Sequence, residues 1–366
     1  MSVKPIALYL PQYHPIPEND LWWGEGFTEW TNVRKATPQF SGHYQPHIPR
    51  ELGYYDLRQL SVMEAQAELA QAHGVYGFCY YHYWFNGKLL LQQPLEQMLA
   101  AKKPDMPFCL CWANENWSRR WDGREQDLLM KQHYSADDDR EHIRYLIRYF
   151  RDDRYIKIHG KPVLIMYRPE LHPTIKNAAE VWREEVRRAG FDGLYLINVE
   201  NFTNGVDPDA YGFDAAMEFA PDFRCHGPKY LKRFPASYLI MKFLHKLSLC
   251  KSGFFDNQVY SYDALVENML KKATATYKQF RTVCPSWDNS ARRKQNATIF
   301  HGATPQEFEE WVRKIACYTA ERFESDEQFL FVNAWNEWGE GCHLEPDQRF
   351  GLDFLQALKN GLDIQI

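Results

Sequence analysis

The sequence predicts a single (β/α)8 TIM barrel that spans residues 1–366 as one α/β domain. Two observations carry this prediction. Eight short apolar runs recur along the chain, rich in β-branched and aromatic residues and too short for helices, as expected of buried strands. Amphipathic helical patterns lie between these runs, and such alternation is typical of parallel α/β folds.

The eight expected strands follow one another from end to end of the chain. Each run ends in polar or aromatic residues, where a strand would give way to a loop. Together they cover residues 6–10, 75–85, 108–117, 162–167, 194–201, 214–221, 282–289 and 329–338.

Four helices are predicted from their periodicity and their ends. The first pattern stops at Gly74, and the last opens with Thr304 and Pro305, which suit an N-cap and the first helical turn. The four patterns cover residues 56–74, 135–152, 177–190 and 304–323.

Two long connections depart from an ideal barrel. Residues 11–57 form a long loop after the first strand, and a helical insertion is expected near 222–279. A doubly wound Rossmann-type sheet is the structural alternative. No G-x-G-x-x-G follows the first strand, so that alternative lacks its usual dinucleotide-binding signature.

The composition narrows the class of function. The net charge is −5, without a block of like charges, so we expect no nucleic-acid partner. No apolar run approaches the ~18 residues of a membrane span. The run from Ile6 to Leu10 is too short for a signal peptide. These features favour a cytoplasmic protein without a transmembrane segment.

The sequence gives no clear metal or cofactor signature. Cys109 and Cys111 lie in an apolar run, where they suit small buried hydrophobes. Asp137–Asp139 resembles the acidic motif with which nucleotide-sugar transferases hold a divalent metal. The run opens a predicted helix, however, where acidic residues interact favourably with the helix dipole, and we favour that interpretation. We therefore expect no cofactor and no metal.

Aromatic residues make up 16% of the chain and gather beside Glu, Asp, Asn and His in stretches such as "LWWGEGFTEW" and "WANENWSRRWDG". Rings with a polar tip suit flat-faced ligands, including sugars. The alternative is a large aromatic core.

Glu337 and Glu340 are the candidate catalytic residues. They lie in "NAWNEWGEGCHLEP", at the end of the eighth strand, where a barrel carries its active site. Two carboxyl groups with different pKa values can supply the acid and the base that cleavage of a glycosidic bond needs. The alternative is a structural role, in which these carboxylates bond loop backbone or pair with arginine.

The other strand ends and loops supply candidates for sugar binding, because they share one rim of a barrel. For His82 a core histidine, and for Glu345 a turn cap, remain alternatives. The candidates are Tyr9, Gln12, Tyr13, Trp30, His82, Tyr83, Trp84, Asn114, Glu115, Trp117, Glu218, Trp287, Asp288, Asn289, Arg292, Trp335 and Glu345.

Four motifs in this order resemble the WbsX-type family: "ALYLPQYHPIPENDLWWGEGFTEWTNV", "CWANENWSRRWDG", "PSWDNSARR" and "NAWNEWGEGCHLEPD". The resemblance runs from about residue 4 to residue 356. Members of this family are usually labelled glycosyltransferases of O-antigen and other surface-polysaccharide clusters, and are also described as glycoside hydrolase family 99-like.

The resemblance implies a fold and a mechanism. The more distant family 99 endo-α-mannosidases are (β/α)8 barrels whose catalytic pair lies in an N-E-W-x-E-G motif, here residues 336–341. By analogy, Glu337 would assist the substrate's own 2-hydroxyl in attacking the anomeric carbon through an anhydro-sugar intermediate. Glu340 would be the acid/base, with net retention and no metal.

We therefore expect a carbohydrate-active enzyme that cleaves or transfers α-glycosidic bonds of an oligosaccharide or polysaccharide with retention, in surface-polysaccharide metabolism. One alternative is a glycosyltransferase with an activated donor, which needs a metal or basic residues on the rim, where Arg119, Arg120 and Arg292 lie. The other is a non-catalytic glycan-binding barrel, favoured if Glu337 and Glu340 lie far apart or are both held in salt bridges.

Overall fold

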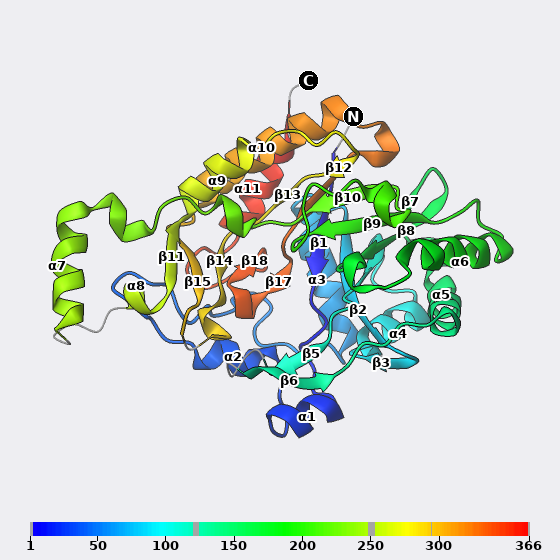
Figure 1. Ribbon diagram of the computed structural model, residues 1–366, viewed down its shortest axis with the longest axis horizontal. Coiled ribbons are helices and arrows are strands. Elements are labelled where there is room, and N and C mark those ends of the chain that lie inside the picture. Colours follow the sequence, from blue (N-terminus) through cyan, green and yellow to red (C-terminus); the bar gives the residue numbers. More distant parts are fainter. Residues whose placement is uncertain (1–2, 120–123, 248–252, 294, 365–366) are drawn as a thin grey trace.

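The protein is a parallel α/β barrel, as the sequence predicts. The computed structural model describes residues 3–119, 124–247, 253–293 and 295–364, and Figure 1 shows helices packed around the strands. The barrel strands lie in the order β12-β10-β9-β8-β4-β2-β1-β16-β13, with every neighbouring pair parallel. Their bounds are β1 Lys4–Tyr9, β2 Gly77–Phe85, β4 Phe108–Trp112, β8 Lys161–Met166, β9 Tyr195–Glu200, β10 Ala215–Glu218, β12 Gln279–Phe280, β13 Thr282–Val283 and β16 Phe329–Val332.

The seventh strand is divided, and the barrel nearly closes there. β12 pairs with β10, β13 pairs with β16, and Arg281 lies between the two short strands. The sequence prediction placed this strand at 282–289, which is wrong at both ends. Pro285 has no N–H for a strand ladder, and Trp287–Asp288 (β14) pairs instead with β15, Thr298–His301, in a separate sheet.

The helices cover the outside of the barrel. All four predicted helices are present within a few residues of their expected bounds, as α3 Leu60–Ala72, α5 Ala136–Phe150, α6 Ile175–Arg188 and α10 Pro305–Arg322. Three shorter helices were not predicted, because nine or ten residues show less than three turns of periodicity. They are α4 Gln93–Ala101, α9 Tyr262–Leu270 and α11 Asp353–Leu362.

The loops after the strands carry their own small elements. The connection after β1 forms α1 Pro17–Trp23 and α2 Glu29–Lys35. The remaining short strands are β3 Lys88–Leu90, β5 Trp117–Arg119, β6 Arg124–Met130, β7 Lys157–Ile158, β17 Asn336–Glu337 and β18 Cys342–His343.

The insertion near 222–279 is largely helical, as expected. Its last helix, α9, occupies the place of a barrel helix between β10 and β12. Before it come α7 Pro235–Lys246, α8 Gly253–Asp256 and β11 Gln258–Ser261, and β11 joins the sheet of β14 and β15. In Figure 1 α7 stands at the left-hand end of the molecule, away from the barrel.

Part of the aromatic content lies in the core. Among the described residues, five tryptophans are almost completely buried: Trp112, Trp182, Trp311, Trp335 and Trp338. Within the described ranges, no helix combines the length and the apolar character needed to cross a bilayer.

Candidate active site

A cavity of about 220 Å³ opens at the C-terminal ends of the barrel strands, where a TIM barrel carries its active site. We call it the central pocket. Its walls come from β2 and from the loops after β1, β4, β8, β10, β13 and β16. The residues that line it are Leu10, Gln12, Asn19, Trp23, Tyr81, Tyr83, Ala113, Glu115, Asn116, Trp117, Ser118, Leu129, Tyr167, Phe219, Arg292, Glu337 and Glu340.

Arg292 joins the two candidate catalytic carboxylates. Its Nη2 lies 2.8 Å from Oε2 of Glu337, and its Nη1 lies 2.7 Å from Oε1 of Glu340. Its Nε lies 2.8 Å from Oε1 of Glu29, a fully buried residue of α2. Three carboxyl groups thus meet one guanidinium. Arg293 also acts on Glu340 and lowers its pKa, but two positive charges still cannot neutralise three carboxylates. Either the cluster stays negative or it holds a proton.

The electrostatics of the cluster favour a bound proton. Burial raises the pKa of Glu337 to about 8, although Arg292 acts in the opposite direction. Burial raises the pKa of Glu340 as well, again against the effect of Arg292. Coupled carboxyls of this kind share protons and can present an acid and a base at one time. An acid and a base at one site are the two groups that cleavage of a glycosidic bond needs.

A tight turn sets the positions of Glu337 and Glu340. Glu337 pairs with Cys342 in the β17–β18 hairpin, and Glu340 follows Gly339 in the turn. The side chain of Asn336 fastens this hairpin to the end of β1, accepting from Leu10 N at 2.7 Å and donating to Leu10 O at 3.0 Å. The hairpin is thus fixed to the first barrel strand.

Gly339 allows the turn to pack closely. A Cβ at this position would collide with the carboxylate of Glu29 and would lie 2.8 Å from Nε of Arg292. Only glycine lets Glu29 and Arg292 meet beside the turn.

Aromatic rings form much of the pocket wall. Tyr83 and Trp117 meet edge to face with centroids 5.2 Å apart, and Tyr81 and Tyr167 do so at 6.1 Å. Trp23 and Phe219 complete the aromatic wall. Rings with polar tips suit the flat faces and hydroxyl groups of a sugar.

Polar groups in the same pocket can bond hydroxyls. Asn19 is fully buried, and among the described residues neither its amide nitrogen nor its oxygen has a hydrogen-bond partner. A buried amide normally bonds a partner, so a ligand hydroxyl would satisfy it. Glu115 also lines the pocket and pairs with Arg168 at 2.7 Å.

The central pocket brings together seven of the residues predicted from the sequence. These are Gln12, Tyr83, Glu115, Trp117, Arg292, Glu337 and Glu340. Six residues of the pocket and its ion-pair cluster were not predicted from the sequence: Asn19, Trp23, Glu29, Tyr81, Tyr167 and Phe219. For Tyr81 a signal existed, because alternate residues of a strand share one face and Tyr81 lies two positions before Tyr83.

Five other candidates do not line the central pocket and contact other buried residues instead. Glu345 is buried and accepts from Trp338 Nε1 at 2.6 Å, Gln66 Nε2 at 2.6 Å and Tyr55 OH at 2.8 Å. Burial raises the pKa of Glu345 to about 7, against the effect of these hydrogen bonds. The other four are Tyr9, which donates to Gln66; Tyr13, which donates to Asn336 O; Trp30, which donates to Tyr55 O; and Trp335, which packs on Phe78.

His82 and Trp84 do not line the central pocket either. His82 Nε2 lies 3.0 Å from Nε2 of His142 on α5, and burial lowers the pKa of His82 to about 3. Trp84 donates to Asp138 at 2.9 Å. The helix interpretation of Asp137–Asp139 is confirmed, because this run forms the first turn of α5.

Asn114 and Glu218 have structural partners. Asn114 Nδ2 donates to Tyr134 OH at 2.9 Å and to Arg168 O at 2.7 Å. Glu218 lies at the divided seventh strand, where it pairs with Arg281 and Lys272, each at 2.7 Å. Both side chains therefore hold loops or strands together.

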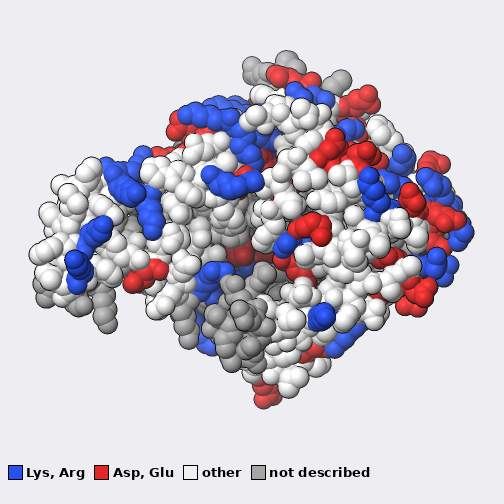
Figure 2. All heavy atoms as spheres, viewed as in Figure 1, with Lys and Arg blue, Asp and Glu red and all other residues white. Residues whose placement is uncertain are grey.

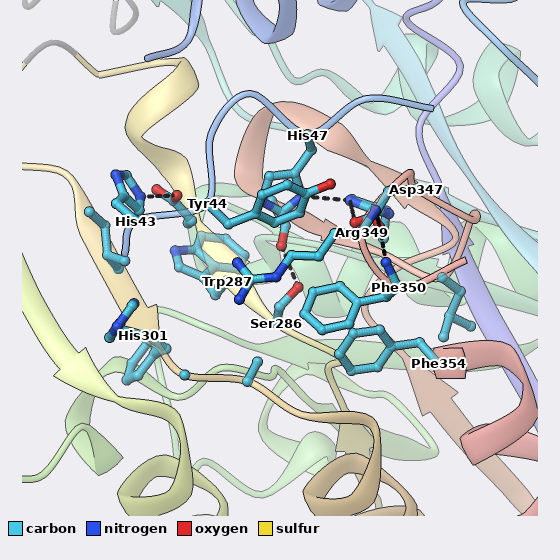
Figure 3. Close-up of a pocket in the computed structure, with 18 of the residues that line it drawn as sticks. His43, Tyr44, His47, Ser286, Trp287, His301, Asp347, Arg349, Phe350 and Phe354 are labelled. Atoms are coloured by element: carbon cyan, nitrogen blue, oxygen red, sulfur yellow. Dashed lines mark hydrogen bonds and ion pairs between the residues drawn. The ribbon is translucent and has the colours of Figure 1, made fainter. Parts of the chain in front are cut away.

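Trp287 and Asp288 line a second cavity, of about 90 Å³, shown in Figure 3. Burial alone would raise the pKa of Asp288, but hydrogen bonds from His43 at 2.6 Å and Gln45 at 2.7 Å outweigh it and lower the pKa. Asn289 accepts from the backbone N of Thr298 at 2.8 Å.

Three buried residues of the second cavity could offer ligands to a metal ion. The ligand atoms of His47, His343 and Asp347 lie within 4.8 Å of one another. As they stand, Nδ1 of His47 and Nε2 of His343 hydrogen-bond to each other at 2.8 Å, and Nδ1 of His343 donates to Glu345 O at 2.8 Å. The imidazoles are thus satisfied by protein partners.

The basic residues expected on the rim are only partly described. Arg292 is held by carboxylates of the pocket. Arg120 lies outside the described residues, and the side chain of Arg119 is likewise not described.

Comparison with known proteins identifies related sequences over almost the whole chain. The family described as Glycosyltransferase WbsX matches residues 5–358. Two curated relatives, both named "Uncharacterized protein WxcX", come from Xanthomonas campestris pv. campestris strains B100 and ATCC 33913. Each is 42% identical over 357 residues, which are 98% of this chain and 49% of the relative. The chain therefore spans about half the length of these relatives.

Solved structures share the fold. A glycoside hydrolase-like protein superimposes with a TM-score of 0.60 at 14% identity, covering 100% of this chain and 95% of the other. The GH99 endo-alpha-mannosidase from Bacteroides thetaiotaomicron superimposes with a TM-score of 0.56 at 16% identity, covering 97% and 95%. At this level of identity, the likeness establishes the barrel alone.

Proposed function

The chain belongs to the WbsX glycosyltransferase family, and from this premise we propose that it cleaves or transfers α-glycosidic bonds with retention of configuration. The observation that carries the proposal is the pair Glu337 and Glu340, joined by Arg292 in a pocket lined with aromatic rings. A fold shared with a GH99 endo-alpha-mannosidase agrees with it. We also propose that the substrate belongs to a surface polysaccharide of the O-antigen type.

We assign the two carboxyl groups different roles. Glu337 is the more buried, with its side chain 8% exposed against 23% for Glu340. We place Glu337 against the ring of the sugar being cleaved and Glu340 toward the opening, where the leaving group departs. This assignment makes Glu337 the base and Glu340 the acid, so the proton that the pair shares lies on Glu340 when the sugar is bound, although burial raises the pKa of Glu337 in the free protein.

The chemical step balances with these two groups. Glu337 accepts the proton of the sugar's 2-hydroxyl while O2 attacks C1, and Glu340 donates its proton to the departing glycosidic oxygen. Glu340 then takes a proton from water or from an acceptor hydroxyl, which opens the anhydro-sugar at C1, and O2 recovers the proton held by Glu337. Two inversions at C1 give retention.

The walls of the central pocket would bind the sugar. We propose that Trp117 and Tyr83 pack on its apolar faces and that Gln12, Glu115 and Asn19 bond its hydroxyls. Asn19 is the strongest of these assignments, because its buried amide has no hydrogen-bond partner among the described residues.

A glycan-binding protein without turnover is the second candidate. The observation that favours it is that Glu337 and Glu340 are both ion-paired with the same arginine, as expected of structural carboxylates. The cluster holds more carboxyl groups than positive charges and can therefore keep a proton, which favours catalysis instead.

NMR of anomeric protons separates these candidates. Purified wild-type protein is incubated with a panel of α-linked oligosaccharides beside Glu340→Gln, Glu337→Gln and the exposed control Glu321→Gln. We expect wild type and the control to release a sugar whose first-formed anomer is α, and both pocket variants to be silent. Release of the β anomer first would contradict retention.

The same panel tests the alternatives. Binding shifts without any product, in wild type as in the variants, would favour the non-catalytic barrel. Product formation only after nucleotide sugars are added would favour a transferase that uses an activated donor.

A further inference from the structure

Helix α7 exposes an apolar face that the described structure leaves uncovered. None of its residues is buried. Leu239 is 64% exposed, Ile240 61% and Phe243 63%, and Leu247 directly after the helix is 50% exposed. Large apolar side chains usually occur singly on the surface of a monomer, and a contiguous group marks an interaction site.

The helix has two distinct faces. Residues three and four apart lie on one side of a helix, so Leu239, Phe243 and Leu247 form one stripe, with Ile240 beside it. On another side, Tyr238 and His245 contact Phe255 of α8, with ring centroids 6.2 Å and 4.9 Å apart. The exposed stripe is therefore an outward face of a helix that already packs on the protein.

The segment around α7 is strongly basic. Residues 223–255 contain seven lysines and arginines and neither Asp nor Glu, although the whole chain has a net charge of −5. Lys242 and Lys246 are exposed on α7 itself and flank the apolar stripe. Figure 2 shows basic side chains among uncharged ones at this left-hand end of the molecule.

We propose that α7 docks on the surface of an anionic phospholipid bilayer. An apolar stripe edged with lysines is the pattern of a helix that lies in the plane of a membrane. The stripe would enter the boundary between headgroups and acyl chains, and Lys242 and Lys246 would reach the anionic headgroups with their ammonium groups. With 12 residues, or about 18 Å, α7 lies along the surface.

The charge distribution around α7 favours an anionic bilayer over a protein as the partner of this surface. Protein interfaces deplete lysine at their centre, whereas anionic lipids attract clusters of basic residues whatever their detailed geometry. A second copy of this chain would bring another basic segment against the first, and like charges repel. An anionic bilayer is complementary both to the apolar stripe and to the lysines beside it.

Vesicle co-sedimentation tests the proposal without reference to catalysis. The full chain is mixed with phosphatidylcholine vesicles or with vesicles that also contain phosphatidylglycerol. We expect binding to the anionic vesicles only, weakened by added salt because the attraction is partly electrostatic. The same result with Glu340→Gln would separate docking from the proposed activity.

Three variants identify the surface. Leu239→Ser with Phe243→Ser removes the stripe, and Lys242→Glu with Lys246→Glu reverses the basic edge. We expect each pair to weaken binding on the order of tenfold or more. The control Leu21→Ser alters another leucine, 82% exposed on α1, and should bind like wild type. All these side chains are exposed, and circular dichroism confirms that each variant is folded.

Two results would overturn the proposal. One is equal sedimentation with both kinds of vesicle, or with neither. The other is a dimer in light scattering that the Leu239→Ser/Phe243→Ser variant abolishes, because a second copy would then cover this face.

Discussion

At the scale of single residues, the site depends on the ion pairs of its buried carboxylates. Arg292 contacts Glu29, Glu337 and Glu340, with three distances between 2.7 and 2.8 Å. Burying an ionised carboxylate without a partner is costly, so this guanidinium is a requirement of the fold as well as of the pocket.

Replacing Arg292 should destabilise the protein in a pH-dependent way. In Arg292→Gln the carboxylates lose their cation, and breaking a buried ion pair by removing one partner costs about 3–5 kcal/mol. At pH 5 the carboxyl groups can take up protons, so the loss should be smaller than at pH 8. Urea unfolding at both pH values measures this difference.

The control for this experiment is Arg187→Gln, which changes an exposed arginine on α6 and should alter stability little at either pH. An equal loss of unfolding free energy for Arg292→Gln at pH 5 and pH 8 would show that packing, rather than charge, accounts for the effect of the substitution.

Glu345 gives a second prediction at this scale. Its pKa in the folded protein is about 7, above the ordinary value of 4.5. Between these pH values the folded state binds more protons than the unfolded state, so stability falls as pH rises. The stabilising contribution of Glu345 to the free energy of unfolding is complete below pH 4.5 and is lost as the pH passes 7. Its size is ~3 kcal/mol at most.

The variant Glu345→Gln cannot titrate, so its free energy of unfolding should fall less between pH 5 and pH 8 than that of wild type. It should also be less stable at pH 5, because an amide N–H would face one of the donors Tyr55, Gln66 or Trp338. Identical pH slopes for both proteins would refute the assignment.

At the scale of elements, strand β2 shows what sequence analysis could and could not predict. Its apolar and aromatic run identified the strand, and alternation divides the side chains between two faces. Tyr81 and Tyr83 line the central pocket, whereas His82 and Trp84 meet His142 and Asp138 of α5. The sequence did not show which face of β2 lines the pocket. When both faces of a strand are buried, the pattern of its residues does not distinguish them.

The contacts that the loop residues make could not be predicted from the sequence. Glu29 lies on α2 and meets Arg292, 263 positions further along the chain. His43 meets Asp288 over 245 positions. Such pairs depend on how the long connection after β1 folds across the rim, which no local pattern of residues encodes.

The turn between β17 and β18 yields a prediction at this scale. In Gly339→Ala the added methyl group would push Glu29 away from the turn and disturb its bond to Arg292. We expect turnover of any cleaved glycan to fall by a factor of ~100, because a displacement of about 1 Å can have that effect on catalysis. Anomeric-proton NMR measures the rate.

Thermal unfolding of Gly339→Ala completes the test. A loss of activity in a variant that is still folded would support the view that Gly339 keeps Glu29 and Arg292 in place. Unchanged activity would show that Glu29 can move without affecting the site.

At the scale of the whole molecule, the order of strands and helices was predictable and the closure of the barrel was not. The alternation of apolar runs and helical patterns is repeated throughout the chain and specifies the class of fold. The divided seventh strand depends instead on Arg281, which reaches Glu218 and the backbone O of Met269, each at 2.7 Å. An arginine inside a barrel strand is intelligible only once its buried partner is known.

The pairing of the first strand with the last also affects how the chain matures on the ribosome. β1 pairs with β16 along Lys4–Ala7, and Leu10 at the end of β1 holds the β17–β18 hairpin through Asn336. A nascent chain that stops short of residue 329 would leave one edge of β1 without its partner, and open strand edges promote aggregation. Glu337 and Glu340 would thus reach their places in the central pocket only after β16 has been made and has joined β1.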